Sequence, residues 1–428
     1  MNKSINSKRL IAFDFLRGMA ILGILFVHRM HYSWLVMSSK ESIHQNFHGA
    51  NAIFIVVAIA LFTMAGLFYL ISGAVNVYSI YNRIRQDQTT ARKIIGGGLF
   101  TGLWFVFLHL VQRILFMNGF RAVDGQIPEY PVGLLTGRII YHEWVPFYWK
   151  QAVDSSTLSL IGMIVIAVSI TTALLFRNSG YRHLRRNQLL LTGLGLIVAL
   201  ISPIALRFLR PVFEQALNSG HYLTAGFVGI LASRFGLFPY LSYGFFGAVL
   251  GLALAAGVES RQILKYLSRA ILIWLLIGLA ALATILLIRN IQVSTKMLFV
   301  SSGVVCIELG LFLWFMRFSL RRFDFTPSSK PTNSGGLSVI RRFGLLAMTV
   351  YILEPFLAAI LTNIIAMFAG QNWQNSFGWI IGLGLLCAIC WHFIIKFWSR
   401  VNYSGSFEWL YIFLSRKFHI KDSHKLPE

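Results

Sequence analysis

The sequence predicts an all-α, polytopic integral membrane protein with about ten transmembrane helices, and two observations carry this prediction. Of its 428 residues, 56% are hydrophobic and only 12% are charged, which is about half the charged fraction of an ordinary soluble domain. The apolar residues also arrive in long runs. This composition excludes intrinsic disorder, and three cysteines are too few for a disulfide-stapled secreted module.

Ten stretches are long and apolar enough for a membrane-spanning helix, which needs about 20 such residues. They are residues 10–33, 52–79, 94–116, 156–176, 188–209, 236–257, 267–288, 296–316, 343–369 and 376–399. None of them alternates with period two, so the pattern favours helices over membrane strands.

The positive charges of the connections predict how these helices are oriented. The net charge of +23 arises from 38 Lys and Arg against 15 Asp and Glu. If successive helices alternate in direction, 26 of the cations fall on the side of the two termini and 11 on the other, with Arg17 inside the first helix. Cytoplasmic loops carry the excess of Lys and Arg. Both termini are therefore predicted to be cytoplasmic, and the charge is not a sign of nucleic-acid binding.

Three connections have a distinctive composition. The outer connection 117–155 is rich in aromatic residues such as Tyr130 and Trp144. These fit either an aromatic belt at the headgroup level or a lid over an extracytoplasmic substrate. The apolar piece 222–235 is too short to span the membrane and is predicted to be re-entrant or interfacial. Residues 317–342 indicate a flexible cytoplasmic linker.

Ionisable side chains inside the first predicted helix indicate a functional site, because a charge at the bilayer centre costs about 2.5–3.5 kcal/mol on insertion scales. Asp14 and Arg17 are three residues apart and share a helical face, where they would form an ion pair. His28 lies eleven residues after Arg17, on the same face and roughly 16 Å further along the helix. All three could serve structure alone. A functional His28 would be a general base, because imidazole is suited to proton removal near neutral pH.

Asp14, Arg17, Gly18, Ala20 and His28 form the pattern D-x-x-R-G-x-A followed by a histidine eleven residues after the arginine. This pattern resembles the first helix of the transmembrane acyltransferase superfamily, which includes the acyltransferase-3 O-acylases, the heparan-α-glucosaminide N-acetyltransferase group and uncharacterised bacterial relatives. Weaker similarities follow along the chain. The segment FTMAGLFYLISG resembles the second helix of the superfamily, and the tail YSGSFEWLYIFLSRK resembles the ending of the bacterial relatives.

The resemblance implies a membrane enzyme that moves an acyl group, usually acetyl, from cytoplasmic acyl-CoA to a glycan or similar acceptor across the membrane. It implies one transmembrane acyltransferase-like domain over residues 1–400 and a cytoplasmic tail over 401–428, in the plasma or inner membrane. His28 would deprotonate an acceptor hydroxyl or amine, Arg17 would line the donor tunnel, and Asp14 would hold Arg17 in place. Direct transfer is preferred, and an acyl-histidine intermediate stays open.

The resemblance also suggests where the donor binds. Arg92 and Lys93 stand where relatives have a basic pair opening the third helix, and they would hold the CoA phosphates at a cytoplasmic mouth. Ser72 of the second helix joins them in the expected donor-binding set. Acyl-CoA would be a substrate rather than a permanently bound cofactor. The same two cations also fit ordinary positive-inside loop charge.

Further polar residues interrupt the apolar stretches. His109 and Arg113 are four residues apart on one helical face, and Glu354 lies in the ninth stretch. These three are expected to contact the substrate. Glu308 is a candidate partner for the cations. His392 lies close to two cysteines, but no fourth ligand is evident, so no metal site is predicted.

Two other function classes compete with the acyltransferase. A proton-coupled secondary transporter or a flippase would use Asp14, Arg17 and Glu354 as a proton relay, and a membrane scaffold would use none of these residues. The sequence predicts the lipid bilayer, acyl-CoA and a carbohydrate or amine acceptor as partners. It does not fix the acceptor, the acyl length or the oligomeric state, and a homodimer is one option that it leaves open.

Overall fold

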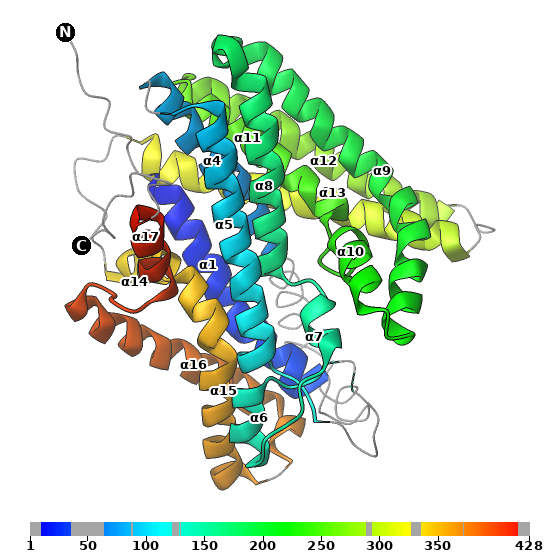
Figure 1. Cartoon of the computed structure of the whole chain (residues 1–428), viewed down its shortest axis with the longest axis vertical. Coiled ribbons are helices and arrows are strands. Elements are labelled where there is room, and N and C mark those ends of the chain that lie inside the picture. The colour runs from blue at the N-terminus through cyan, green and yellow to red at the C-terminus, as the bar shows by residue number, and fades with distance from the viewer. Residues whose placement is uncertain are drawn as a thin grey trace. The chain divides into compact units, whose positions relative to one another are not determined.

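A computed structural model of the chain describes residues 10–35, 64–86, 89–121, 128, 130–287, 293–326, 335–370 and 372–417 (Figure 1). Within these ranges 86% of the residues are helical and no strand occurs. Nine helices of the described residues are long and apolar enough to cross a membrane. The predicted class, an all-α membrane protein, is confirmed at this level.

The nine membrane-length helices correspond to nine of the ten predicted stretches. The remaining stretch, 52–79, is only partly described, because residues 52–63 lie outside the described ranges. Its described part belongs to helix α4 (Ala65–Arg85). The apolar piece 222–235 forms the short helix α10 (Tyr222–Ala232), as its length predicts.

The described residues form two compact units. Unit 1 draws on Met1–Leu16, Gly66–Val106 and Asp154–Thr332, and unit 2 draws on Arg17–Ala65, Phe107–Val153 and Asn333–Glu428. Two helices, α1 (Ile11–His28) and α5 (Ala91–Val111), contribute residues to both units. That the units act as the single domain predicted over residues 1–400 stays a prediction.

Unit 1 contains most of the long helices. Besides α4, α10 and parts of α1 and α5, they are α8 (Thr157–Phe176), α9 (Leu184–Asn218), α11 (Leu237–Ala255), α12 (Ser260–Leu287) and α13 (Val293–Ser319), with the short segments η3 (Arg177–Arg182) and η4 (Leu320–Asp324). Helix α8 begins at a capping box, in which Ser156 accepts a hydrogen bond from the Leu158 amide and donates its own amide hydrogen to Ser159. Helices α9 and α11 pack together, as do α12 and α13.

Small residues let the backbones of α4 and α11 approach closely within unit 1. A Cβ atom at Gly73 would overlap the carbonyl oxygen of Gly244, and one at Gly247 would overlap that of Leu70. Small residues at helix interfaces permit such close contact in membrane proteins. There, helices associate through van der Waals packing rather than through the hydrophobic effect. The predicted S-G segment at Ser72–Gly73 therefore has a packing role at its glycine.

Replacing Gly73 with alanine is expected to destabilise the protein by about 1–3 kcal/mol, because the new methyl group overpacks a backbone contact. Gly96→Ala is the matched control, since no atom lies within 4 Å of the corresponding Cβ position. The control gains helix propensity of about 0.8–1.0 kcal/mol. Thermal denaturation midpoints of the detergent-solubilised variants check both, and equal midpoints for the two would contradict the packing argument.

Unit 2 contains the C-terminal part of α1, the C-terminal end of α5 and a further set of helices. They are α6 (Leu134–Tyr141), α7 (Trp149–Val153), α14 (Gly335–Leu345), α15 (Ala347–Ala369), α16 (Phe377–Trp398) and α17 (Phe407–Lys417), with η1 (Arg29–Leu35), η2 (Gln112–Phe116), η5 (Trp373–Asn375) and η6 (Ser399–Val401). A Cβ atom at Gly18 would overlap the carbonyl oxygen of Ile340. The glycine of the first-helix motif therefore lets α14 pack against α1.

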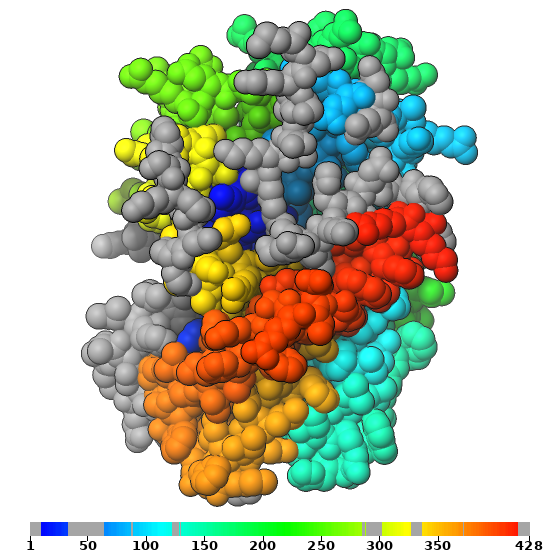
Figure 2. All heavy atoms as spheres, turned by 90° about the vertical axis from the view of Figure 1, so that its left-hand side faces the viewer, coloured from blue at the N-terminus to red at the C-terminus, as the bar shows by residue number. Residues whose placement is uncertain are grey.

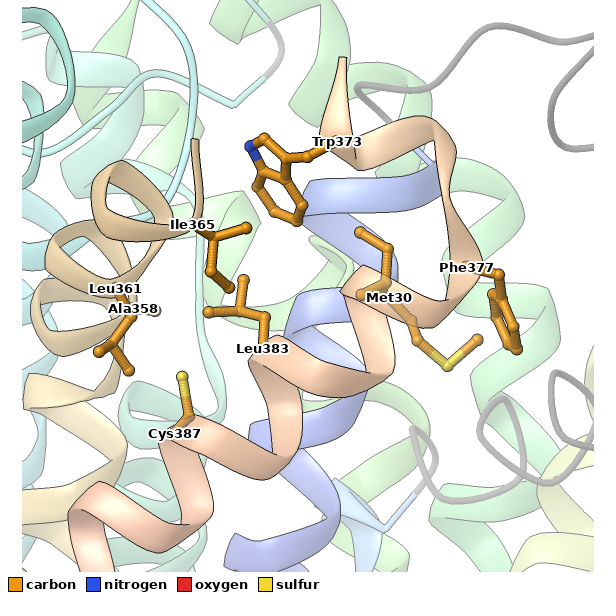
Figure 3. Close-up of a cluster of buried hydrophobic side chains, with 9 residues drawn as sticks. Met30, Ala358, Leu361, Ile365, Trp373, Phe377, Leu383 and Cys387 are labelled. Carbon is orange, nitrogen blue, oxygen red and sulfur yellow. The ribbon is translucent and has the colours of Figure 1, made fainter. Parts of the chain in front are cut away.

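A core of apolar side chains holds α15, α16 and the start of η1 together in unit 2 (Figure 3). Met30 contributes from η1, Ala358, Leu361 and Ile365 from α15, and Leu383 and Cys387 from α16. All of these side chains are less than a tenth exposed. Because Met30 packs into this core, η1 is held against α15. The core therefore positions Arg29, the residue before Met30, next to α15.

Carboxylates from distant parts of the chain cap the N-terminal ends of α1 and α15. Asp324 accepts hydrogen bonds from the amides of Ile11 and Ala12 at 3.0 and 2.9 Å, at the start of α1. Glu408 of α17 accepts hydrogen bonds from the amides of Met348 and Thr349 at 2.7 and 3.2 Å, at the start of α15. Negative groups at helix N-termini satisfy free amides and complement the helix dipole.

The described part of the predicted tail is thus a packed element of unit 2. Figure 2 shows α17, in red, on the surface of the molecule, and its Glu408 side chain turns inward to α15. Burial raises the pKa of the Glu408 carboxyl, and a hydrogen bond from the Thr349 hydroxyl acts in the opposite direction.

Replacing Glu408 with alanine is expected to cost about 0.5–2 kcal/mol of stability, which is typical for the loss of a helix cap. Glu214→Ala removes an exposed glutamate and is expected to change the thermal midpoint little. If both variants denature at the wild-type temperature in detergent, Glu408 does not hold the start of α15.

Candidate functional site

Three polar side chains meet where α1 ends. His28 is the last residue of α1, and Arg29 opens the π-helical segment η1. The His28 Nδ1 atom lies 3.0 Å from Oε2 of Glu354, and the Arg29 Nη2 atom lies 2.6 Å from Oε1 of the same carboxylate. Segments of π-helix occur frequently at functional sites. Here the segment places two consecutive side chains, His28 and Arg29, on one partner.

Burial separates the roles of these residues. The side chains of Glu354 and Arg29 are 0% and 3% exposed, whereas that of His28 is 17% exposed. A buried carboxylate is stable only when it is paired and hydrogen-bonded, and Arg29 supplies the compensating charge. The imidazole is therefore the member of the cluster that an incoming molecule can reach.

The hydrogen bond to Glu354 fixes the chemistry of the His28 ring. An ionised carboxylate only accepts hydrogen bonds, so Nδ1 carries the hydrogen and donates it. In the neutral ring the other nitrogen, Nε2, then has a free lone pair. No other hydrogen bond of the His28 ring is seen among the described residues. A carboxylate that orients an imidazole in this way makes the second nitrogen a proton acceptor.

Two aromatic rings pack against His28. The rings of Tyr32 and Tyr351 lie with their centroids 5.8 and 6.1 Å from the imidazole centroid. Tyr130, from the aromatic connection 117–155, packs edge-on against His31 and Tyr32 at 5.7 and 6.2 Å. This part of the connection thus packs against η1 next to His28; whether it serves as a lid or as an aromatic belt stays a prediction.

The C-terminal residues of α5 and the adjoining segment η2 lie near the same cluster. The Gln112 side chain donates a hydrogen bond to the Tyr351 carbonyl at 3.4 Å. Arg113 is buried, donates to the sulfur of Met117 at 2.9 Å, and its charge acts on the Tyr32 phenol. His109 is buried too, and its Nε2 atom donates to the Ala152 carbonyl at 3.4 Å. Of the predicted substrate-binding residues, Glu354 therefore contacts His28 directly, and His109 faces α7.

The other predicted site residues lie elsewhere on the described chain. Asp14 is buried and Arg17 is half-buried, both on α1. Ser72 is half-buried on α4, and Arg92 and Lys93 are exposed in the first turn of α5. Asp14, Ser72, Arg92 and Lys93 belong to unit 1, whereas Arg17 and His28 belong to unit 2. Their predicted functional roles stay predictions.

Sequence reasoning missed Arg29, Tyr32 and Tyr351 as site residues. Arg29 is one of the 11 cations counted on the side opposite the termini, although its position next to His28 is a usable signal. Tyr32 follows His28 by four residues, and Tyr351 precedes Glu354 by three, so each shares a helical face with a site residue. Among the described residues no group of His, Cys, Asp and Glu could hold a metal ion.

Comparison of the chain with protein-family models finds no match, and comparison with curated proteins finds none either.

Proposed function

We propose that the protein is a membrane-embedded acyltransferase that moves an acyl group, acetyl in the first instance, from cytoplasmic acyl-CoA to a hydroxyl or amine on the other side of the membrane. The contact between His28 and Glu354 carries the proposal. It supports a base whose tautomer is fixed, whose free nitrogen can accept a proton, and whose ring is accessible.

The proposed reaction uses His28 to remove the proton of the acceptor hydroxyl or amine. The freed lone pair attacks the thioester carbonyl, a bond forms between the acceptor and the acyl carbon, and the carbon–sulfur bond breaks. Coenzyme A leaves as the thiol once it receives a proton. Glu354 stabilises the imidazolium that forms in between, because its carboxylate already accepts the Nδ1 hydrogen.

The proposal gives the remaining polar residues supporting roles. Arg92 and Lys93, exposed at the start of α5, would hold the phosphates of the donor, with Ser72 beside the acyl arm. Arg17, held by Asp14, would line the path of the thioester. Rings such as Tyr32, Tyr130 and Tyr351 would contact the acceptor, and Arg113 with His109 would back them. Both termini would be cytoplasmic, in a plasma or inner membrane.

The test is to supply the purified protein with radiolabelled acetyl-CoA and to measure the release of free CoA together with label transfer to added glycans and amines. CoA release that depends on His28 is the expected result. A proton-coupled transporter or flippase would instead move protons across the membrane of reconstituted vesicles without any acyl-CoA. Proton movement without CoA release would reject the acyltransferase in favour of that class.

A further inference from the structure

A further carboxyl group, which is half-buried, lies in unit 1, where the proposed acyl transfer has no use for it. Glu308 of α13 lies 3.2 Å, through Oε2, from the hydroxyl oxygen of Tyr243 on α11. The same hydroxyl lies 3.0 Å from the backbone carbonyl oxygen of Val305. The Tyr243 side chain is completely buried. One phenol therefore bridges a carboxyl group and a carbonyl group inside two helices of membrane length.

Counting hydrogens at this bridge decides the protonation state of Glu308. A phenol carries one hydrogen, and a backbone carbonyl can only accept. If Glu308 is ionised, it too can only accept, and Tyr243 can satisfy only one of its two neighbours. If Glu308 is a neutral acid, its hydroxyl donates to the Tyr243 oxygen, and Tyr243 donates to Val305. Only the protonated acid makes both close contacts hydrogen bonds.

Among the residues that the structure describes, no cation pairs with Glu308. No Lys, Arg or His among the described residues lies within 4.0 Å of its carboxyl group. The titratable groups seen to interact with it among the described residues are Tyr243 and Tyr240, both from α11. An ionised carboxylate without a cation is costly inside a membrane, so the environment agrees with the hydrogen count.

Packing keeps this cluster tight. A Cβ atom at Gly66 of α4 would overlap the rings of Tyr243 and Phe312, and Phe312 lies one helical turn after Glu308 on α13. The Tyr240 ring lies 5.8 Å from that of Tyr243 and 5.2 Å from that of Tyr69. The positive charges of Arg210 and Arg234 interact with the Tyr240 phenol. The rings of Tyr243, Tyr240 and Tyr69 therefore form one contiguous aromatic cluster beside Glu308.

We propose that Glu308 and Tyr243 form a proton-binding site within unit 1, in which the carboxyl group of Glu308 holds a proton at neutral pH. The site differs in kind from the cluster around His28, because Glu354 forms an ion pair with Arg29, whereas no cation in the described part of the chain contacts Glu308. The ligand of this site is a proton, and the site stands whether or not the protein transfers acyl groups.

Infrared difference spectroscopy of the full-length protein at pH 7 tests the proposal. The spectrum of wild type minus Glu308→Gln is expected to contain the carbonyl band of a protonated carboxylic acid. Tyr243→Phe is expected to shift that band to higher frequency, because the hydrogen bond is lost. Glu214→Gln, at an exposed site, is expected to show ionised carboxylate bands instead. Carboxylate bands for Glu308 would overturn the proposal.

A second measurement needs no variant and so does not depend on folding of the mutants. A hydrophobic carbodiimide reacts with protonated carboxyl groups in apolar surroundings. Mass spectrometry of the treated wild-type protein is expected to find Glu308 modified and Glu354 unmodified. Modification of Glu354 with Glu308 untouched would reverse the assignment and reject the site.

Discussion

Replacing His28 with glutamine is expected to lower acyl-CoA turnover by about 10²–10⁴-fold, the usual contribution of a positioned general base. The glutamine amide can still donate a hydrogen bond to Glu354, so the Arg29–Glu354 pair keeps its neighbour. It has no nitrogen that accepts a proton at neutral pH. The variant should therefore fold and bind the donor while losing catalysis. Steady-state CoA release, with donor binding and thermal midpoint measured in parallel, checks this.

His392→Gln is the matched control for this experiment. His392 is a half-buried histidine of α16 in the same unit, and the proposal gives it no role. It should retain wild-type turnover. If the two variants lose activity equally, the loss reflects general damage to unit 2. If His28→Gln turns over at the wild-type rate, His28 is not the base.

Much of the fold could be predicted from the sequence, because a membrane helix needs a long apolar run and such runs are visible without a structure. The stretches 188–209 and 236–257 correspond to α9 and α11 within a few residues at most ends. Helix α9 is longer than its stretch because its ends, such as Arg210 to Asn218, continue as helix beyond the apolar run. Apolar length sets a minimum for a helix and does not fix its ends.

The candidate site could be predicted only in part. His28 and Glu354 were found as ionisable residues in apolar runs, where such groups are costly. That they touch could not be predicted, because 326 positions separate them along the chain and no local pattern encodes so distant a contact. Arg29 was misjudged for a related reason. A cation at the end of a helix looks the same in sequence whether it faces headgroups or a buried carboxylate.

The motif residue Gly18 illustrates the same limit. Its small size allows a close neighbour, and the structure supplies that neighbour as the Ile340 carbonyl of α14. The sequence identifies the need for space but not the helix that fills it. Partners such as Asp324 and Glu408, which cap α1 and α15 from distant segments, are beyond local reasoning for the same reason.

Replacing Glu354 with alanine is expected to have the largest effect on stability, about 3–5 kcal/mol, because it leaves the buried guanidinium of Arg29 without its charge partner. Activity should fall as well, since the Nδ1 hydrogen of His28 loses its acceptor. Glu354→Gln keeps a side-chain oxygen that can accept a hydrogen bond from His28 or Arg29. Its losses of stability and activity should therefore be smaller. Thermal midpoints and CoA release of the purified variants are the measurements.

A double variant separates the charge effect from the orientation effect. Arg29→Met removes the cation, and its combination with Glu354→Gln leaves neither charge buried while an amide oxygen can still accept from His28. Residues in one salt-bridge network are not additive, so the double variant should denature at a higher temperature than the sum of the two single effects predicts. It should also recover part of the activity that Arg29→Met loses, if orientation of the imidazole is what Glu354 supplies. Strictly additive losses in both stability and turnover would mean that Arg29 and Glu354 do not act as one unit.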